Sequence, residues 1–114
     1  MGKLRIAVAT NGNKGLDDVL SNVFGRAKTF TIIDAEDGNV TAVKVLENSA
    51  ATYHHGAGPI AVKMLVDEGV NVVVANELGL GASDLLEQHN VKVTSIKPGT
   101  KVEAATEKVL HANT

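Results

Sequence analysis

The chain contains no cysteine and no tryptophan, and its 114 residues include only one tyrosine and two phenylalanines. Without cysteine there can be no disulfide framework, no thiolate nucleophile, no cysteine-type zinc site and no conventional cysteine-held iron–sulfur cluster. So few aromatic rings cannot build a base-stacking platform for nucleic acid. These absences exclude several common classes of redox, metal and nucleic-acid-binding protein.

Strong net charge and long hydrophobic runs are absent as well. Lysine and arginine number 11 against 13 aspartate and glutamate residues, which gives a net charge of -2. Such a balance argues against a nucleic-acid binder that works by bulk electrostatics. No apolar run approaches the roughly 18 residues of a membrane span, and residues 1–5 lack the apolar region of a signal peptide. We therefore expect a cytoplasmic protein with neither a membrane nor a nucleic-acid partner.

What is present is a composition typical of a folded domain. Hydrophobic residues make up 44% of the chain, which is close to the average of globular proteins. A chain of this length should bury roughly 65% of the surface of its unfolded state. We find no internal repeat, low-complexity tract or domain boundary, and no feature demands an oligomer. The prediction is a single domain over residues 1–114 that acts as a monomer.

Hydrophobic periodicity predicts alternating strands and helices along most of the chain. Strands are expected at residues 4–9, 29–34, 40–46, 70–75 and 91–94, and helical stripes lie within residues 57–65, 82–89 and 102–110. The acidic turn between the second and third strands favours an antiparallel hairpin, and the β-branched run at 70–75 is typical of a parallel strand buried on both faces. The order β-β-β-α-β-α-β-α therefore predicts an α/β sandwich with a mixed sheet and right-handed crossovers.

Specific residues mark the expected helix ends. Pro59 suits the first position of the first helix, where its missing N–H has no intrahelical partner. Gly69 and Asn90 are expected to end the first and second helices. Thr100 and Glu103 have the spacing of a capping box, which predicts that the third helix begins directly after Thr100.

Three glycine-rich loops, at residues 11–28, 54–58 and 76–81, are expected to meet at one edge of the sheet. Ligands of open α/β sheets bind outside the carboxyl ends of the strands. Two of these loops lead into helices, whose first N–H groups and positive dipole ends favour anions. We therefore predict a site for an anionic or metal-containing ligand. The candidate binding residues are Asn11, Gly25, Arg26, Gly56, Gly58, Gly79 and Gly81, and the candidate metal ligands are His54 and His55.

Plainer roles compete with these assignments. Neighbouring side chains point in different directions in most backbones, so His54 and His55 serve either as metal ligands or as exposed or hydrogen-bonding residues. Arg26 contacts a ligand or pairs with one of the aspartates at 17 and 18. Gly79 and Gly81 lack the third glycine of a dinucleotide fingerprint, so a tight strand-to-helix turn competes with phosphate binding.

Two sequence blocks resemble a known family. Residues 21–27, SNVFGRA in one-letter code, resemble the S-x-H-F-G-R-A signature of the dinitrogenase iron–molybdenum cofactor biosynthesis family, the group of NifX, NafY and the C-terminal domain of NifB. Residues 55–59 (HGAGP) and 69–74 (GVNVVV) are similar to the family's H-G-A-G and G-V-D-V-V-I blocks. The blocks occur in the right order and spacing, and the resemblance covers nearly the whole chain.

The resemblance implies a fold and a function. The fold is a three-layer, ribonuclease H-like α/β sandwich with a mixed five-stranded sheet, and relatives bind or carry the iron–molybdenum cofactor, its precursors or a related metal–sulfur cluster. One departure is Val23, which stands where the motif has histidine. Since cysteine is also absent, His54 and His55 are left as the cluster ligands that the resemblance implies. Arg26 and helix N–H groups would then donate hydrogen bonds to the sulfur and oxygen atoms of the anionic cluster.

Three functions follow from these observations. The first is a non-enzymatic carrier of an anionic iron- or molybdenum-containing sulfide cluster, which would exchange its cargo with a cluster donor or acceptor protein. The second is a metal-free regulatory or interaction module that binds a small anion or a protein partner. The third, a ribonuclease H-like nuclease, has little support because two-metal cleavage needs clustered carboxylates, beginning with one on the first strand. Residues 4–9 contain none, and Asp34 and Glu77 lie at strand ends.

Overall fold

A computed structural model describes residues 2–112 of the chain. Within this range the expected strands and helices are all present in the expected order. They are β1 (Lys3–Thr10), the short 3-10 helix η1 (Gly15–Asp17), β2 (Thr29–Glu36), β3 (Asn39–Glu47), α1 (Ala57–Asp67), β4 (Val72–Ala75), α2 (Leu80–Gln88), β5 (Lys92–Ser95) and α3 (Val102–Ala112). Only η1 has no counterpart among the predicted elements.

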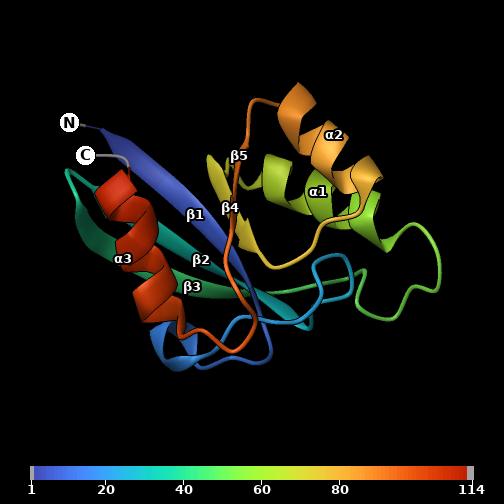
Figure 1. Cartoon of the computed structure of the whole chain (residues 1–114), viewed down its shortest axis with the longest axis horizontal. Coiled ribbons are helices and arrows are strands. Elements are labelled where there is room, and N and C mark those ends of the chain that lie inside the picture. The colour runs from blue at the N-terminus through green and yellow to red at the C-terminus, as the bar shows by residue number, and fades with distance from the viewer. Residues whose placement is uncertain (1, 113–114) are drawn as a thin grey trace.

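The five strands form one mixed sheet in the order β3-β2-β1-β4-β5. The pairs β1–β2 and β2–β3 are antiparallel, whereas β1–β4 and β4–β5 are parallel. Helix α3 covers one face of the sheet, and α1 and α2 cover the other (Figure 1). The predicted three-layer α/β sandwich with a mixed five-stranded sheet is therefore confirmed. No helix among residues 2–112 is long and apolar enough to cross a membrane.

The core is divided between the two faces of the sheet because strand side chains alternate in direction. On β1, Ala7 and Ala9 belong to the cluster under α1 and α2, and Ile6 and Val8 belong to the cluster under α3. All four residues are fully buried. Strand β1 is therefore the central strand of the sheet, between β2 and β4. The loops that follow β1 and β4 lie at the same edge of the sheet because these two strands are parallel.

Two helices end as predicted. Gly69 and Asn90 follow α1 and α2 and adopt left-handed conformations, with φ angles of 75° and 60°. In each case the next N–H reaches back to the helix: Val70 N–H donates to Leu65 O at 3.2 Å, and Val91 N–H donates to Leu86 O at 2.9 Å. Such bonds satisfy carbonyl groups that the last helical turn leaves free.

Two helix starts differ from the prediction. Helix α1 begins at Ala57, so Pro59 is its third residue instead of its first. The proline is still tolerated because N–H groups of the first turn have no intrahelical acceptor. Helix α3 begins after Lys101 and not after Thr100, so the capping-box prediction is wrong by one residue. A distant segment satisfies this terminus instead, since Val102 N–H donates to Asp18 O at 2.9 Å.

Candidate functional site

A hollow of about 330 Å³ lies beyond the carboxyl ends of β1 and β4. Three segments that are far apart in the sequence form its walls: the end of the long connection after β1, the first turn of α1 and the start of α2. The lining residues are Val23, Phe24, Gly25, Arg26, Ala57, Gly58, Pro59, Gly79, Gly81 and Ala82. We call this hollow the glycine cleft. Its three walls come from the three loops that were expected to meet.

The contact between Gly25 and Gly58 sets the width of the glycine cleft. A Cβ atom on Gly25 would lie 2.7 Å from the nitrogen and 2.9 Å from the Cα of Gly58. Both of these are main-chain atoms that cannot rotate away, so no side chain fits at Gly25. By contrast, a Cβ atom on Gly79 or Gly81 would meet nothing within 4 Å. The wall formed by the start of α2 is therefore open, and its N–H groups lie near free space.

Buried residues fix the position of the loop that carries Arg26. Phe24 and Ala27 are almost completely buried on either side of Gly25 and Arg26. The ring of Phe24 packs against Phe30 of β2, with centroids 5.4 Å apart. Arg26 itself is exposed between these anchors. The loop thus presents a cation at the cleft from a firmly packed base.

Sequence reasoning missed Asn48, which follows β3 and is 6% exposed. Its side-chain amide donates hydrogen bonds to Gly25 O at 2.9 Å and Ala27 O at 2.8 Å, on both sides of Arg26. Its Oδ1 accepts the N–H of Ala50 at 3.0 Å. An asparagine at a strand end is an ordinary turn residue in sequence, and no local pattern indicates that its partners lie more than twenty residues upstream.

The electrostatic character of the glycine cleft is positive. Arg26 is the one charged residue that lines it, and no described residue forms an ion pair with Arg26. The alternative in which Asp17 or Asp18 pairs with Arg26 is therefore wrong for the described part of the chain. Asp18 instead accepts the N–H groups of Lys14 at 3.2 Å and Val19 at 2.8 Å. The starts of α1 and α2 add the positive ends of two helix dipoles to the charge of Arg26.

Four other candidate residues lie outside the cleft lining. Asn11 is exposed directly after β1, and His54 and His55 are exposed in the loop before α1. Gly56 precedes α1 with a φ angle of 74°, in open space. Nowhere in residues 2–112 do three histidine, cysteine, aspartate or glutamate side chains group as they would around a metal ion. The cleft lining therefore includes Arg26 and the first residues of α1, and neither His54 nor His55 is part of it.

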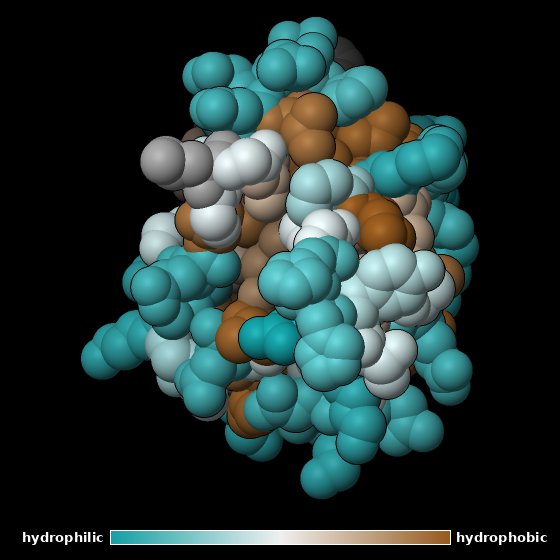
Figure 2. All heavy atoms as spheres, turned by 90° about the vertical axis from the view of Figure 1, so that its right-hand side faces the viewer, coloured by the Kyte–Doolittle hydropathy of each residue, from teal (hydrophilic) through white to brown (hydrophobic). Residues whose placement is uncertain are grey.

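Figure 2 shows the molecule from the side of α1 and α2 and of the loops that lead into them. Hydrophobic residues gather in the middle of this face, and hydrophilic residues surround them. Val23, which lines the glycine cleft, is 44% exposed. The cleft lining therefore combines an exposed apolar side chain with the cation of Arg26.

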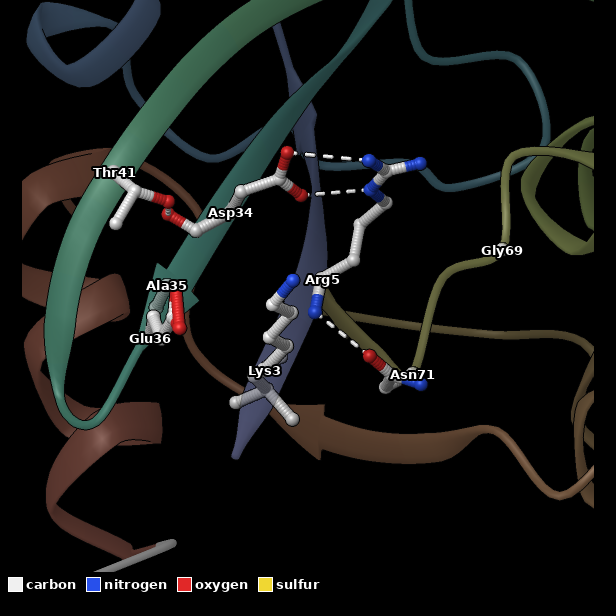
Figure 3. A pocket seen from close by; sticks show the side chains of 9 residues that line it. Lys3, Arg5, Asp34, Ala35, Glu36, Thr41, Gly69 and Asn71 are labelled. Carbon is white, nitrogen blue, oxygen red and sulfur yellow. Dashed lines mark hydrogen bonds and ion pairs between the residues drawn. The ribbon is translucent and has the colours of Figure 1, made fainter. Parts of the chain in front are cut away.

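A second hollow, of about 370 Å³, lies at the opposite end of β1. Here charged side chains point at one another (Figure 3). Arg5 of β1 donates to both carboxylate oxygens of Asp34 of β2, at 2.7 and 3.2 Å, and to Glu68 O at 2.6 Å. The hydrogen bond from Arg5 lowers the pKa of the Asp34 carboxyl group below its ordinary value. Asn71 completes the hollow by accepting the main-chain N–H of Arg5 at 2.7 Å.

The family model for the dinitrogenase iron-molybdenum cofactor matches residues 2–112. The chain belongs to this family, and the resemblance seen in its sequence blocks is confirmed. The family match, together with the structure, defines the protein as a member of this family with a mixed five-stranded α/β fold.

Solved structures support the fold assignment. The apo form of the orange protein from Desulfovibrio gigas is 33% identical, with a TM-score of 0.86 over 95% of this chain and 88% of that one. A candidate NifB protein from Thermotoga is 35% identical, with a TM-score of 0.72 over 96% of this chain and 88% of that one. An uncharacterised protein of Methanocaldococcus jannaschii is 28% identical over 90 residues, which are 79% of this chain and 72% of that protein.

Proposed function

We propose that this protein is a non-enzymatic carrier of an anionic metal–sulfur cluster, which is the iron–molybdenum cofactor or a related iron- or molybdenum-containing sulfide. The cargo binds in the glycine cleft, against Gly25, Arg26, Gly58, Gly79 and Gly81. Membership of the family supports the class of cargo. The observation that carries the proposal is the cleft itself, in which an arginine without an ionic partner among the described residues faces two helix starts.

The chemistry of such a cargo suits these walls. A sulfide-rich cluster carries negative charge on its outer atoms and brings most of its metal ligands with it. The protein then has to supply hydrogen-bond donors and positive charge more than metal–ligand bonds. Main-chain N–H groups at helix starts and a guanidinium are donors of this kind. Because glycines have no side chain, a bulky ion can approach the main chain of the cleft closely.

His54 and His55 are the metal ligands in this proposal. They lie in the exposed loop that leads into α1, next to the cleft wall formed by Ala57 and Gly58. One of them binds a metal of the cargo when the loop lies against it, since imidazole suits iron and copper sites. The carrier acts as a cytoplasmic monomer, and the open mouth of the cleft lets a donor or acceptor protein exchange the cargo.

The first test is metal analysis of protein purified without oxygen from its own host, together with a visible absorption spectrum. Molybdenum, iron or copper near stoichiometric amounts, with a coloured band, is the expected result. A colourless, metal-free protein that also fails to bind added tetrathiomolybdate would overturn the carrier proposal.

Variants then test the site. Changing His54 and His55 together to alanine should abolish uptake of a cluster that contains open metal positions. His89→Ala is the matched control, because His89 is an exposed histidine at the far end of α2. Equal uptake by the double variant and the control would remove the histidines from the site.

One observation favours a second function, a metal-free module that binds a small anion or a protein partner. Val23 lines the glycine cleft and is 44% exposed, where the family motif has a metal-binding type of residue. A cleft that keeps Arg26 but lacks that side chain can still hold an anion without a metal. Retention of sulfate or phosphate by a protein that refuses thiometalates would favour this second function.

A further inference from the structure

Asn48 joins two loops, the one with Arg26 and the one with His54 and His55, through one buried side chain. It is 6% exposed, and each of its polar groups has a partner. The main-chain N–H of Asn48 donates to Lys28 O at 3.2 Å, and its carbonyl accepts the N–H of Ala51 at 3.1 Å. A buried asparagine that is fully satisfied in this way has one stable orientation.

Toward the arginine loop, the Nδ2 atom of Asn48 donates to Gly25 O at 2.9 Å and to Ala27 O at 2.8 Å. The carbonyl of Gly25 belongs to the peptide group directly before Arg26, and the carbonyl of Ala27 belongs to the peptide group that follows Ala27, so one amide holds the main chain on both sides of the arginine. Rotating the amide by half a turn would place its oxygen against two carbonyl oxygens. The direction of the side chain is therefore dictated by the arginine loop.

Toward the histidine loop, the Oδ1 atom of the same amide accepts the N–H of Ala50 at 3.0 Å. Ala50 is fully buried, and its own carbonyl accepts the N–H of Tyr53 at 3.1 Å. After this point, residues 52–56 are all exposed. Asn48 thus holds the base of the histidine loop, and the exposed tip of the loop lies beyond this hydrogen bond.

We propose that Asn48 is a positioning residue that couples the arginine loop to the histidine loop. The inference rests on the proposed function of the glycine cleft. An anion that binds at Arg26 restrains the peptide groups of Gly25 and Ala27. Through Asn48 it also restrains the base of the histidine loop, so that binding at one wall orders the other. The coupling is reciprocal, because both loops share a single hydrogen-bonded group.

The affinity test uses tetrathiomolybdate as the probe, with wild type, Asn48→Ala, Arg26→Ala and the double variant. Asn48→Ala is expected to weaken binding about fivefold or more, which is the lower range of measured site coupling. The double variant should bind no more weakly than Arg26→Ala alone, since Asn48 acts through the arginine loop. Losses that multiply in the double variant would overturn the positioning role.

The matched control is Asn71→Ala. Asn71 also uses its side chain to hold a distant main-chain group, the N–H of Arg5, but it does so at the opposite end of β1. It should leave the affinity for tetrathiomolybdate unchanged. A loss equal to that of Asn48→Ala would mean that general loosening of the fold explains the result, and the proposal would be wrong.

A second measurement needs no ligand and separates this proposal from the function on which it rests. In the apo protein, Asn48→Ala should speed hydrogen exchange at the N–H groups of Ala27, Ala51 and Tyr53 together, and leave that of Val91 unchanged. Faster exchange in only one of the two loops would overturn the coupling, whether or not the wild type binds tetrathiomolybdate. Failure of the wild type to bind, with exchange changed in both loops, would overturn the carrier function alone.

Asn48→Asp provides a version of the test that keeps the side-chain volume. The carboxylate still accepts the N–H of Ala50 but has no hydrogen to donate to Gly25 O or Ala27 O. Exchange at Ala27 should therefore rise, while exchange at Ala51 stays close to that of the wild type. If bound tetrathiomolybdate slows exchange at Tyr53 in wild type and equally in Asn48→Asp, the link through the amide is wrong.

Discussion

The two ends of β1 carry hollows of similar size that differ in how their polar groups are used. At the amino end, Arg5 meets Asp34, and the charges satisfy one another. At the carboxyl end, Arg26 lies beside glycines and helix starts without an ionic partner in the described part of the chain. The first arrangement stabilises strands, and the second leaves charge available for a ligand.

A charged hollow is not by itself a binding site, as the hollow at the amino end of β1 shows. Arg5, Asp34 and Asn71 in Figure 3 already have partners, so a ligand that used them would have to displace those partners. In the glycine cleft the donors at the helix starts lack intrahelical partners, as the first turn of any helix does. A ligand there replaces water at these donors and does not have to break a hydrogen bond within a helix.

Gly25→Ala should have the largest effect, because it would force apart two walls of the glycine cleft. The added methyl would meet main-chain atoms of Gly58 at 2.7 and 2.9 Å, so the free energy of unfolding should fall by about 1–3 kcal/mol. Urea denaturation measures this change in the free energy of unfolding. Gly81→Ala is the control, because its Cβ atom meets nothing within 4 Å and alanine favours a helix by about 0.5–1 kcal/mol. A Gly25→Ala protein as stable as wild type would show that the two main chains separate easily.

Exchanging the two arginines for alanine separates binding from stability. Arg26→Ala should leave the free energy of unfolding within about 0.5 kcal/mol, as expected for an exposed side chain, and weaken tetrathiomolybdate binding about tenfold through loss of charged hydrogen bonds. Arg5→Ala should do the reverse, lowering the midpoint of urea denaturation while leaving the affinity unchanged. The contrast fails if Arg5→Ala weakens binding as much as Arg26→Ala does.

Val23→His tests whether an imidazole in the glycine cleft binds a metal of the cargo, and its expected effect is smaller than that of the arginine variants. Val23 is exposed, so stability should change by less than about 0.5 kcal/mol. The new imidazole should strengthen binding of a cargo with an open iron or copper position and leave tetrathiomolybdate, which has no open position, unaffected. Isothermal titration with both probes measures the difference. Equal gains for both would indicate charge or packing instead of metal ligation.

The smallest expected effect concerns pH at the amino end. Arg5 lowers the pKa of Asp34, so the pair contributes stability that is fully present above the unfolded pKa of about 4 and is lost as the pH falls through the lower, folded value. Below about pH 4, the urea midpoint of Asp34→Asn should therefore depend less on pH than that of wild type. Near neutrality, the pH dependence of the midpoint should be the same in both proteins. Identical acid profiles for wild type and Asp34→Asn would show that the pair does not stabilise the fold.

Sequence patterns predicted the elements well because their causes are local. The apolar run of β1 and the terminators Gly69 and Asn90 act over a few residues, and the structure confirms them. Local patterns failed at the start of α3, where the partner is the distant Asp18 and not the capping box.

The candidate site was predicted in outline only. Glycine content and helix starts pointed to Gly25, Arg26 and Gly58, which the fold brings together. The two interactions that shape the site were not visible in the sequence. One is the contact of Gly25 with Gly58, and the other is the pair of bonds from Asn48. Both join residues far apart in the chain, and no periodicity or motif encodes such pairs.

The order of strands in the sheet has a consequence for biogenesis. The β2–β3 hairpin joins neighbouring segments and can close within microseconds, whereas β1 has to pair with β4 across a long intervening stretch, which is slow. The walls of the glycine cleft come from both sides of that pairing. A nascent chain still held in the ribosome before α2 emerges therefore has a hairpin but no cleft. Under the proposed function, cargo can bind only after α2 has joined the fold, so it cannot guide the early folding of the hairpin.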